Sequence, residues 1–212
     1  MTQRGTYAKG VAKREEILAS ALEIIAANGF SGASLQEIAQ AVGLSKAGVL
    51  HYFESKEELF VEVLRRRDTL DRAETAAGSD LEVRELESLD LETLDRAGIT
   101  LRTLVAPIRH NVEVPGLIQL YARLAAEATD PDHAAHDYFI ARYAGSTAGV
   151  AHLVSLLRDA GRLRADLDPE AVADMLLALA DGLQTRWLMD PQIDMPARIE
   201  AFISLLEPNG PD

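Results

Sequence analysis

The stretch that most constrains this chain covers residues 31–60. Within it, Ser34 and Glu37 have the S-x-x-E spacing of a capping box, in which a hydroxyl and a carboxylate each bind a free N–H group at a helix start. Apolar side chains then recur at helical spacing, at positions 35, 38, 39 and 42. Gly43 follows, where the end of a helix favours a residue with positive φ. The pattern predicts a short helix that ends in a tight glycine turn.

A second short helix is expected directly after this turn. Leu44 is apolar and can fill the corner, and Ser45 can cap a helix that runs to about Phe53. Ser55 and Glu58 repeat the capping-box spacing and open a third helix. Two helices joined by a tight glycine turn form a helix-turn-helix, the motif that places its second helix in the DNA major groove.

The run from Ser45 to Leu59 reads SKAGVLHYFESKEEL and resembles the signature of the TetR family of bacterial transcriptional regulators. It combines the Gly-Leu-Ser turn, the terminal Phe53 and the Ser-Lys-Glu-x-Leu helix start at fixed offsets. The resemblance is strong over residues 11 to about 65 and weaker beyond them. It implies an all-α fold, with an N-terminal three-helix helix-turn-helix DNA-binding head joined to a C-terminal helical ligand-binding and dimerisation bundle.

The expected domains are a DNA-binding head at residues 1–56, a linking helix at 57–76 and a ligand-binding and dimerisation domain at 77–212. Residues 77–88 are acidic and poorly patterned, which indicates a loop at the boundary. The first helix is expected over 11–28, after a flexible basic arm. Lys13 and Arg14 lie in its first turn, where they either approach a phosphate or remain solvated.

The recognition helix supplies most of the expected DNA contacts. Lys46 stands at its start and can bind guanine acceptors or a phosphate. Ala47 and Gly48 are small enough for a close approach to the bases, and two polar-tipped rings follow one turn later. Helix starts also favour a phosphate, because free N–H groups point outward there. The full set of expected contacts is Ser34, Ser45, Lys46, Ala47, Gly48, His51, Tyr52 and Lys56.

The sequence departs from the common pattern of the family at two places. Leu50 stands where many members carry a tyrosine that holds a phosphate, and Gly48 stands where many carry threonine or asparagine. The role of that tyrosine therefore does not transfer to position 50, and either ring that follows it is the alternative. Val49, Leu50 and Phe53 are expected to pack against neighbouring helices.

The distribution of charge leaves one end of the chain able to approach DNA. The whole chain carries a net charge of −13. Residues 1–56 hold six basic and five acidic side chains, whereas the remainder holds 15 basic and 29 acidic ones. Affinity for DNA depends on cations placed against phosphates rather than on the global charge. The acidic remainder is expected to repel DNA, so only the head can bind it.

The C-terminal part is expected to consist of further helices. One spans residues 89–113, with Pro107 either kinking it or starting it afresh, and the next begins at Pro115. Asp130 and Asp168 each precede a proline, the pattern of a helix cap followed by its first residue. The first of these helices is expected to run to about residue 160, and a last helix spans 196–206.

Two of these helices are expected to form the interface of a homodimer. Residues 147–157 and 171–189 are apolar on nearly every side, so each needs a partner on both faces. An identical chain supplies that partner most simply, through a four-helix interface. The expected interface residues are Val150, Leu153, Val154, Leu157, Leu176, Leu179 and Leu183.

The resemblance also implies a small-molecule effector, expected to be largely apolar, that alters the spacing of the two heads. The physical expectation is an apolar cavity with a few polar tips. Its candidate lining residues are His110, Tyr121, Tyr143 and Trp187, and each of them is also consistent with ordinary core packing.

Other classes of function find little support in the sequence. No GxSxG, P-loop, dinucleotide-binding or HExxH motif is present, so we expect no enzyme and no cofactor. His133 and His136 could bind a metal, but no third ligand is evident and we expect no metal. No run of about eighteen apolar residues occurs and the start of the chain lacks a signal-peptide core, which with the absence of cysteine favours a cytoplasmic protein with no membrane partner.

Two alternatives to a ligand-released regulator stay open at this point. In one, the C-terminal part is an enzyme or carrier that retained a helix-turn-helix. In the other, the head binds DNA but regulation comes from a protein partner, without a ligand pocket. The predicted operator is double-stranded and palindromic, because a symmetric dimer presents two recognition helices to successive major grooves.

Overall fold

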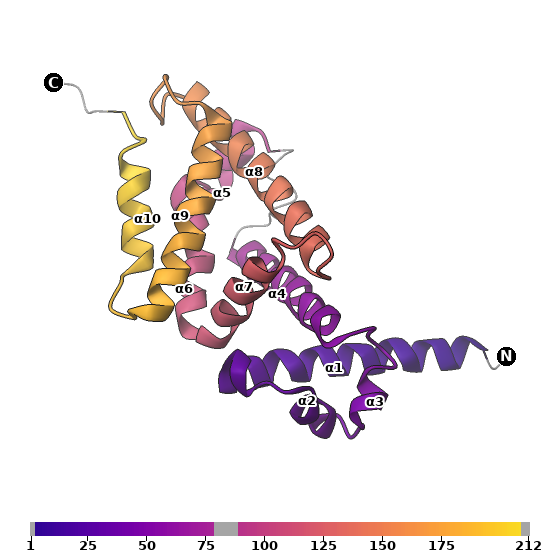
Figure 1. The fold of residues 1–212 in the computed structure, drawn as a ribbon. Coiled ribbons are helices and arrows are strands. Elements are labelled where there is room, and N and C mark those ends of the chain that lie inside the picture. Colours follow the sequence, from indigo (N-terminus) through magenta and orange to yellow (C-terminus); the bar gives the residue numbers. More distant parts are fainter. Residues whose placement is uncertain (1–2, 79–88, 209–212) are drawn as a thin grey trace. The chain divides into compact units, whose positions relative to one another are not determined.

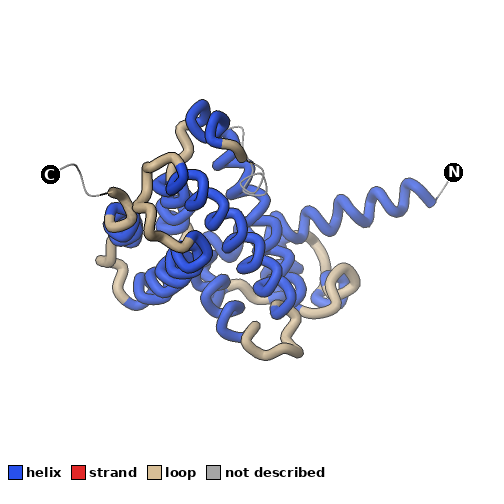
Figure 2. Tube along the Cα trace, turned by 90° about the horizontal axis from the view of Figure 1, so that it is seen from above, coloured by secondary structure: helices blue, strands red, loops and turns tan. Residues whose placement is uncertain are grey.

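The computed structural model describes residues 3–78 and 89–208, and within these ranges it contains helices and loops but no strand (Figures 1 and 2). The predicted all-α fold is therefore confirmed. None of the described helices is long and apolar enough to cross a bilayer. The helices are α1 (Gln3–Gly32), α2 (Leu35–Ala41), α3 (Lys46–Val49), α4 (Lys56–Gly78), α5 (Leu91–Ala97), the 3₁₀ helix η2 (Leu101–Val105), α6 (Ala106–Glu113), α7 (Pro115–Glu127), α8 (His136–Asp159), α9 (Pro169–Met189) and α10 (Met195–Ser204).

The chain forms two compact units that do not follow the boundaries expected at residues 56 and 76. The head unit comprises Met1–Thr69 and Val114–Tyr138, and the body unit comprises Leu70–Glu113 and Phe139–Asp212. The helix-turn-helix thus shares a unit with the first half of α4 and with α7. The expected loop over 77–88 lies mostly outside the described residues.

In the head unit, α1 packs against α2 and most extensively against α7. Ile17, Ala21 and Ile25 follow one face of α1 at helical spacing and are fully buried. On α7, Gly116 lies so close to α1 that a Cβ atom added there would stand 1.9 Å from the Ile25 carbonyl oxygen. This contact between α1 and α7 therefore depends on glycine.

Helix α1 is longer than the sequence indicated. It begins at Gln3, so most of the expected flexible arm is helical. Gly29 has φ 73° and ψ 167°, the positive φ expected at a helix end, but the chain resumes a helical path and continues to Gly32. The first helix therefore ends at Gly29 as predicted, and the residues up to Gly32 form a further helical turn beyond this kink.

The helix expected over residues 89–113 is in fact three elements. Asp90 caps α5, and Gly98 ends it with a left-handed conformation, φ 65°. Thr100 then caps η2, and α6 begins at Ala106 with Pro107 as its second residue. The expected fresh start at Pro107 is therefore correct, but the break at Gly98 was missed.

Helix α8 starts later than predicted, because Asp130 caps a turn. Its Oδ1 accepts a hydrogen bond of 3.0 Å from the N–H of Asp132, and the helix begins only at His136. The helix then continues unbroken to Asp159, and Gly161 follows with φ 72°. At the start of α9 the prediction is confirmed, since Asp168 caps the helix and Pro169 is its first residue.

The body unit is built around contacts of α9 and α10. Helix α10 packs against α9, η2 and α6. Two side-chain hydrogen bonds connect α8 to α9. Tyr143 Oη donates to Asp181 at 2.6 Å, and Thr147 Oγ1 donates to Asp174 at 3.1 Å. Because residue numbers rise along α8 as they fall along α9 in these pairs, the two helices run antiparallel.

Candidate nucleic-acid interface

The first half of the helix-turn-helix is held by the predicted capping box. Ser34 Oγ accepts a hydrogen bond of 3.2 Å from the N–H of Glu37, and a Glu37 carboxylate oxygen accepts one of 2.8 Å from the N–H of Ser34. These bonds to Ser34, the backbone one foremost, hold the pKa of Glu37 below its ordinary value of 4.5. The carboxylate is therefore charged at neutral pH, where it also favours the positive end of the α2 dipole.

The turn between α2 and α3 has the glycine geometry that the sequence indicates. Gly43 has φ 67°, and the N–H of Leu44 donates to the carbonyl of Ala39 at 2.8 Å. Ser45 then caps α3, because its Oγ accepts a hydrogen bond of 3.1 Å from the N–H of Gly48. The recognition helix thus starts at a defined place and direction relative to α2.

The recognition helix is shorter than predicted. Regular α-helix covers only Lys46–Val49, and residues 50–52 form a turn instead of extending the helix to Phe53. Val49 and Phe53, on either side of this turn, are both buried, at 0% and 2% exposed.

Leu50 corrects the expectation that all three apolar side chains of this segment pack inward. Val49 and Phe53 are buried, but Leu50 is 42% exposed. It follows the exposed residues Lys46 and Ala47 by four and three positions, the spacing of one helix face. An exposed apolar side chain here is suited to a thymine methyl group. Its exposure could not be read from the sequence, because Leu50 is as apolar as its buried neighbours.

The expected DNA-contact residues differ in how far they face solvent. Ser34, Ser45, Lys46, Ala47 and His51 are exposed. Lys46 forms no ion pair or side-chain hydrogen bond with any residue whose side chain the structure describes, so its ammonium group is available to a phosphate or a base.

The other residues of this set are partly covered. The His51 and Tyr52 rings meet edge to face at 5.6 Å, and Tyr52 is half-buried. Gly48 is also half-buried, and a Cβ atom there would lie 3.3 Å from Leu44 Cβ. Gly48 therefore faces the corner between α2 and α3. Lys56 is half-buried, and its Nζ lies 5.0 Å from the centre of the Phe60 ring.

Lys13 and Arg14 hold the motif together, a role that neither sequence interpretation included. Lys13 Nζ donates to the carbonyl oxygen of Val42 at 2.7 Å, at the end of α2. Arg14 pairs with Glu62 on α4 at 2.9 Å, and its guanidinium lies 4.8 Å from the centre of the Phe53 ring. These two cations join α1 to α2, to α4 and to the segment that follows α3.

Most of the residues expected at a dimer interface lie in the core of the body unit. Six of them are at most 6% exposed: Val150, Leu153, Val154, Leu157, Leu176 and Leu183. Leu179 is half-buried. Side chains buried within one chain cannot also form its surface, so these six must be removed from the expected interface. The large apolar side chains left exposed on α8 and α9 are Ile140, Met175 and Met189.

The four expected pocket residues belong to two units and remain a prediction as a ligand site. Tyr121 is buried in the head unit, whereas the other three belong to the body unit. His110 is exposed and lies 3.7 Å from the Glu113 carboxylate. Tyr143 donates its hydroxyl to Asp181, and Trp187 is 7% exposed.

The two histidines considered as metal ligands serve local structure. His133 Nδ1 accepts a hydrogen bond of 3.2 Å from the N–H of Ala135, and His136 Nδ1 lies 2.8 Å from the carbonyl oxygen of Ala128. Among the described residues no three histidine or acidic side chains come together as metal ligands.

Comparison with known proteins places both parts of the chain in one family. Residues 17–63 match the description "Bacterial regulatory proteins, tetR family", and residues 115–205 match "BetI-type transcriptional repressor, C-terminal". The two matches together cover more than half of the chain. It belongs to the TetR family. The protein is therefore a DNA-binding transcriptional regulator and not an enzyme.

Individual TetR-family proteins resemble this regulator over most of its length. The HTH-type transcriptional regulator PksA of Bacillus subtilis (strain 168) is 27% identical over 181 residues, which are 84% of this chain and 80% of PksA. A regulator from Saccharomonospora viridis, solved in complex with choline, has a TM-score of 0.70 at 24% identity and covers 92% of this chain and 98% of its own. The SmeT–triclosan complex has a TM-score of 0.67 at 18% identity, over 94% of this chain and 93% of SmeT.

Proposed function

We propose that this TetR-family regulator is a cytoplasmic repressor that binds a palindromic operator as a homodimer and is released by a small molecule. The observation that carries the proposal is the recognition segment. A short helix capped by Ser45 and anchored by Val49 exposes Lys46, Ala47 and Leu50 together. A cation beside small and apolar side chains can combine a phosphate or guanine contact with a thymine methyl contact.

A dimer is required because one such short helix reads few base pairs. In helix-turn-helix dimers the two recognition helices lie about 34–36 Å apart, one helical turn of DNA. We place the dimer contact on the exposed side of α8 and α9. Ile140, Met175 and Met189 are 60%, 50% and 80% exposed there. Small residues surround them on the same helices, including exposed Ala144, Ala148, Ala178 and Gly182, and permit close helix packing.

The small-molecule effector is proposed from the body helices and from the related structures. Two related regulators were solved with small molecules, one with choline and the other with triclosan. In this chain the aromatic residues Phe139, Tyr143 and Trp187 lie on α8 and α9, and the Phe139 and Tyr143 rings are 6.0 Å apart. Such rings give a binding site large apolar contacts, in keeping with the expected largely apolar effector. Effector binding would favour a head spacing that no longer fits the operator.

Selection of bound fragments from the source genome tests this function. Purified regulator should enrich a short set of fragments that share an inverted repeat, and footprinting should protect two half-sites one helical turn apart. Enrichment that is independent of sequence, or protection of a single half-site at saturation, would contradict the proposal. The genes beside the enriched sites would then direct the choice of candidate effectors for release assays.

A further inference from the structure

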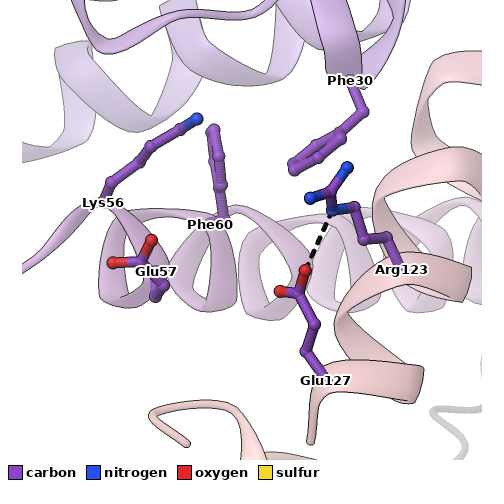
Figure 3. Close-up of a pocket in the computed structure, with 6 residues that line it drawn as sticks. All are labelled: Phe30, Lys56, Glu57, Phe60, Arg123 and Glu127. Atoms are coloured by element: carbon purple, nitrogen blue, oxygen red, sulfur yellow. Dashed lines mark hydrogen bonds and ion pairs between the residues drawn. The ribbon is translucent and has the colours of Figure 1, made fainter.

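The head unit contains a pocket of about 320 Å³, and all the residues that line it belong to this unit (Figure 3). One of them, Lys56, is also among the expected DNA contacts. Three elements line the pocket: the end of α1, the first turn of α4, and α7. The lining residues are Phe30, Lys56, Glu57, Phe60, Arg123 and Glu127. Its volume lies at the small end of the range for ligand sites, about 300–1,000 Å³.

Two cations flank a pair of aromatic rings in this pocket. The Phe30 and Phe60 rings meet edge to face with centres 5.2 Å apart. Lys56 Nζ lies 5.8 Å from the centre of Phe30 and 5.0 Å from that of Phe60, and the Arg123 guanidinium lies 5.2 Å from the centre of Phe30. Figure 3 shows the two cations on either side of the pair of rings.

Most hydrogen-bond donors of Lys56 and Arg123 have no acceptor among the described residues. Arg123 donates only its Nε, to Glu127 at 2.9 Å, and its terminal nitrogens form no hydrogen bond within the described part of the chain. This bond orients the guanidinium with its outer edge free. Lys56 forms no ion pair or hydrogen bond with any described residue. Glu127 is occupied, because Arg123 and, at 3.6 Å, His133 Nε2 lie against it.

A pocket with free cationic donors beside aromatic faces selects for a planar anion. A guanidinium binds a carboxylate through its paired N–H groups, and charge-assisted hydrogen bonds of this kind are the stronger ones. Of the two rings, only that of Phe30 is partly exposed, because Phe60 is 2% exposed. The Phe30 ring can meet an aromatic ligand at offset or edge-to-face geometry. Glu57 lies at the pocket and disfavours a second negative charge, so a monoanion fits better than a dianion.

We propose that this pocket binds a small aromatic carboxylate and that its occupant tunes DNA binding. The occupant would contact α1, α4 and α7 at once. The first turn of α4 follows the recognition segment by only a few residues, and α1 carries the cations that hold that segment in place. A ligand that contacts all three helices would therefore stabilise one position of α3 relative to other positions. The proposal does not depend on an effector in the body unit.

Calorimetric titration of the full-length protein with 2-naphthoate tests the binding site. We expect measurable affinity for 2-naphthoate and none for the neutral 2-naphthamide. Lys56→Gln and Arg123→Gln should each weaken binding about fivefold, which corresponds to about 1 kcal/mol. Arg96→Gln is the matched control, because Arg96 forms an exposed ion pair with Glu92 at four-residue spacing in the body unit and should leave the affinity unchanged.

Three results would overturn the proposal. They are the absence of 2-naphthoate binding to the wild type, equal binding to the wild type and to Arg123→Gln, and equal binding of the neutral amide. The tuning of DNA binding has its own measurement. Operator affinity should change at least about twofold when 2-naphthoate saturates the wild type, and the change should disappear in Arg123→Gln. Unchanged operator affinity at saturation would contradict the regulatory part.

Discussion

Lys46 and Arg14 are both cations of the head unit, but they lie in different surroundings. Lys46 is exposed on the recognition helix and has no partner among the described residues. Arg14 is tied to Glu62 and to the face of Phe53. A cation that binds a phosphate releases counterions when DNA binds, whereas a cation that positions the helix does not. The salt dependence of operator binding therefore separates the two roles.

Replacing each cation with alanine should lower operator affinity for different reasons. Lys46→Ala should weaken binding by about tenfold and reduce the slope of log affinity against log salt by about one. Arg14→Ala should also weaken binding, because α3 is held less firmly, but it should leave the slope unchanged. Fluorescence anisotropy with labelled operator at several salt concentrations measures both quantities. A reduced slope for Arg14→Ala would instead identify Arg14 as a phosphate contact.

At the scale of single helices, local capping and close packing decide where elements begin and how near they approach. The Ser34–Glu37 box starts α2, and Ser45 starts α3. Ser55 Oγ likewise accepts the N–H of Glu58 at 2.9 Å, although the Glu58 carboxylate binds the N–H of Glu54 rather than that of Ser55. Gly116 allows α7 to lie against the backbone of α1.

The capping box of α2 should make the stability of the head depend on acid pH. The pKa of Glu37 is lowered in the folded chain by its hydrogen bonds to Ser34, so its contribution is present above the ordinary value of 4.5. The contribution is lost as pH falls through the lowered pKa. Glu37→Gln should therefore be less stable than the wild type near neutral pH. In urea unfolding followed by circular dichroism, the two should converge on acidification, and a difference that is constant with pH would exclude this role.

The contact between α1 and α7 should not tolerate a methyl group. In Gly116→Ala the added Cβ would meet the Ile25 carbonyl oxygen at 1.9 Å, so the helices must separate. We expect a loss of about 1–3 kcal/mol in the free energy of unfolding, the usual effect of overpacking. Gly10→Ala is the control, because its Cβ has open space within α1 and alanine favours a helix. Equal free energies of unfolding for Gly116→Ala and the wild type would contradict this prediction, because the helices would then separate without loss of stability.

At the scale of the whole molecule, the proposed function depends on two copies of the chain. One head exposes a recognition helix of only four residues, Lys46–Val49. Two heads related by a twofold axis double the contacts and set the spacing of the half-sites. The remainder of the chain after residue 56 has 29 acidic and 15 basic side chains and is expected to repel DNA.

The proposed dimer face can be tested with one exposed methionine. Met175 is 50% exposed on α9, so Met175→Asp should leave the fold of the chain intact while it places a charge at the dimer contact. We expect a shift from dimer to monomer and a loss of operator binding. Size-exclusion chromatography with light scattering measures the mass in solution. Leu205→Asp is the control, because Leu205 is 69% exposed beyond α10 and should leave the dimer unchanged. A Met175→Asp protein that remains dimeric would place the interface elsewhere.

The sequence alone determined the starts of α2, α3 and α9, the glycine turn at position 43 and the all-α class. These features depend on residues two to four positions apart, and such contacts recur wherever the same residues do. The start of α8 was predicted too early, because an aspartate before a proline can cap either a turn or a helix, and Asp130 caps a turn.

Only the tertiary structure decided which side of each apolar segment is inside and what the cations bind. Leu50 and Val49 are both apolar, yet contacts across the head unit bury one and expose the other. Lys13 meets Val42, 29 positions away, and Arg14 meets Glu62, 48 positions away. The leucines of α8 and α9 could likewise be buried either within their own chain or against a second copy of it. Each of these outcomes depends on long-range packing, which no spacing within a single helix encodes.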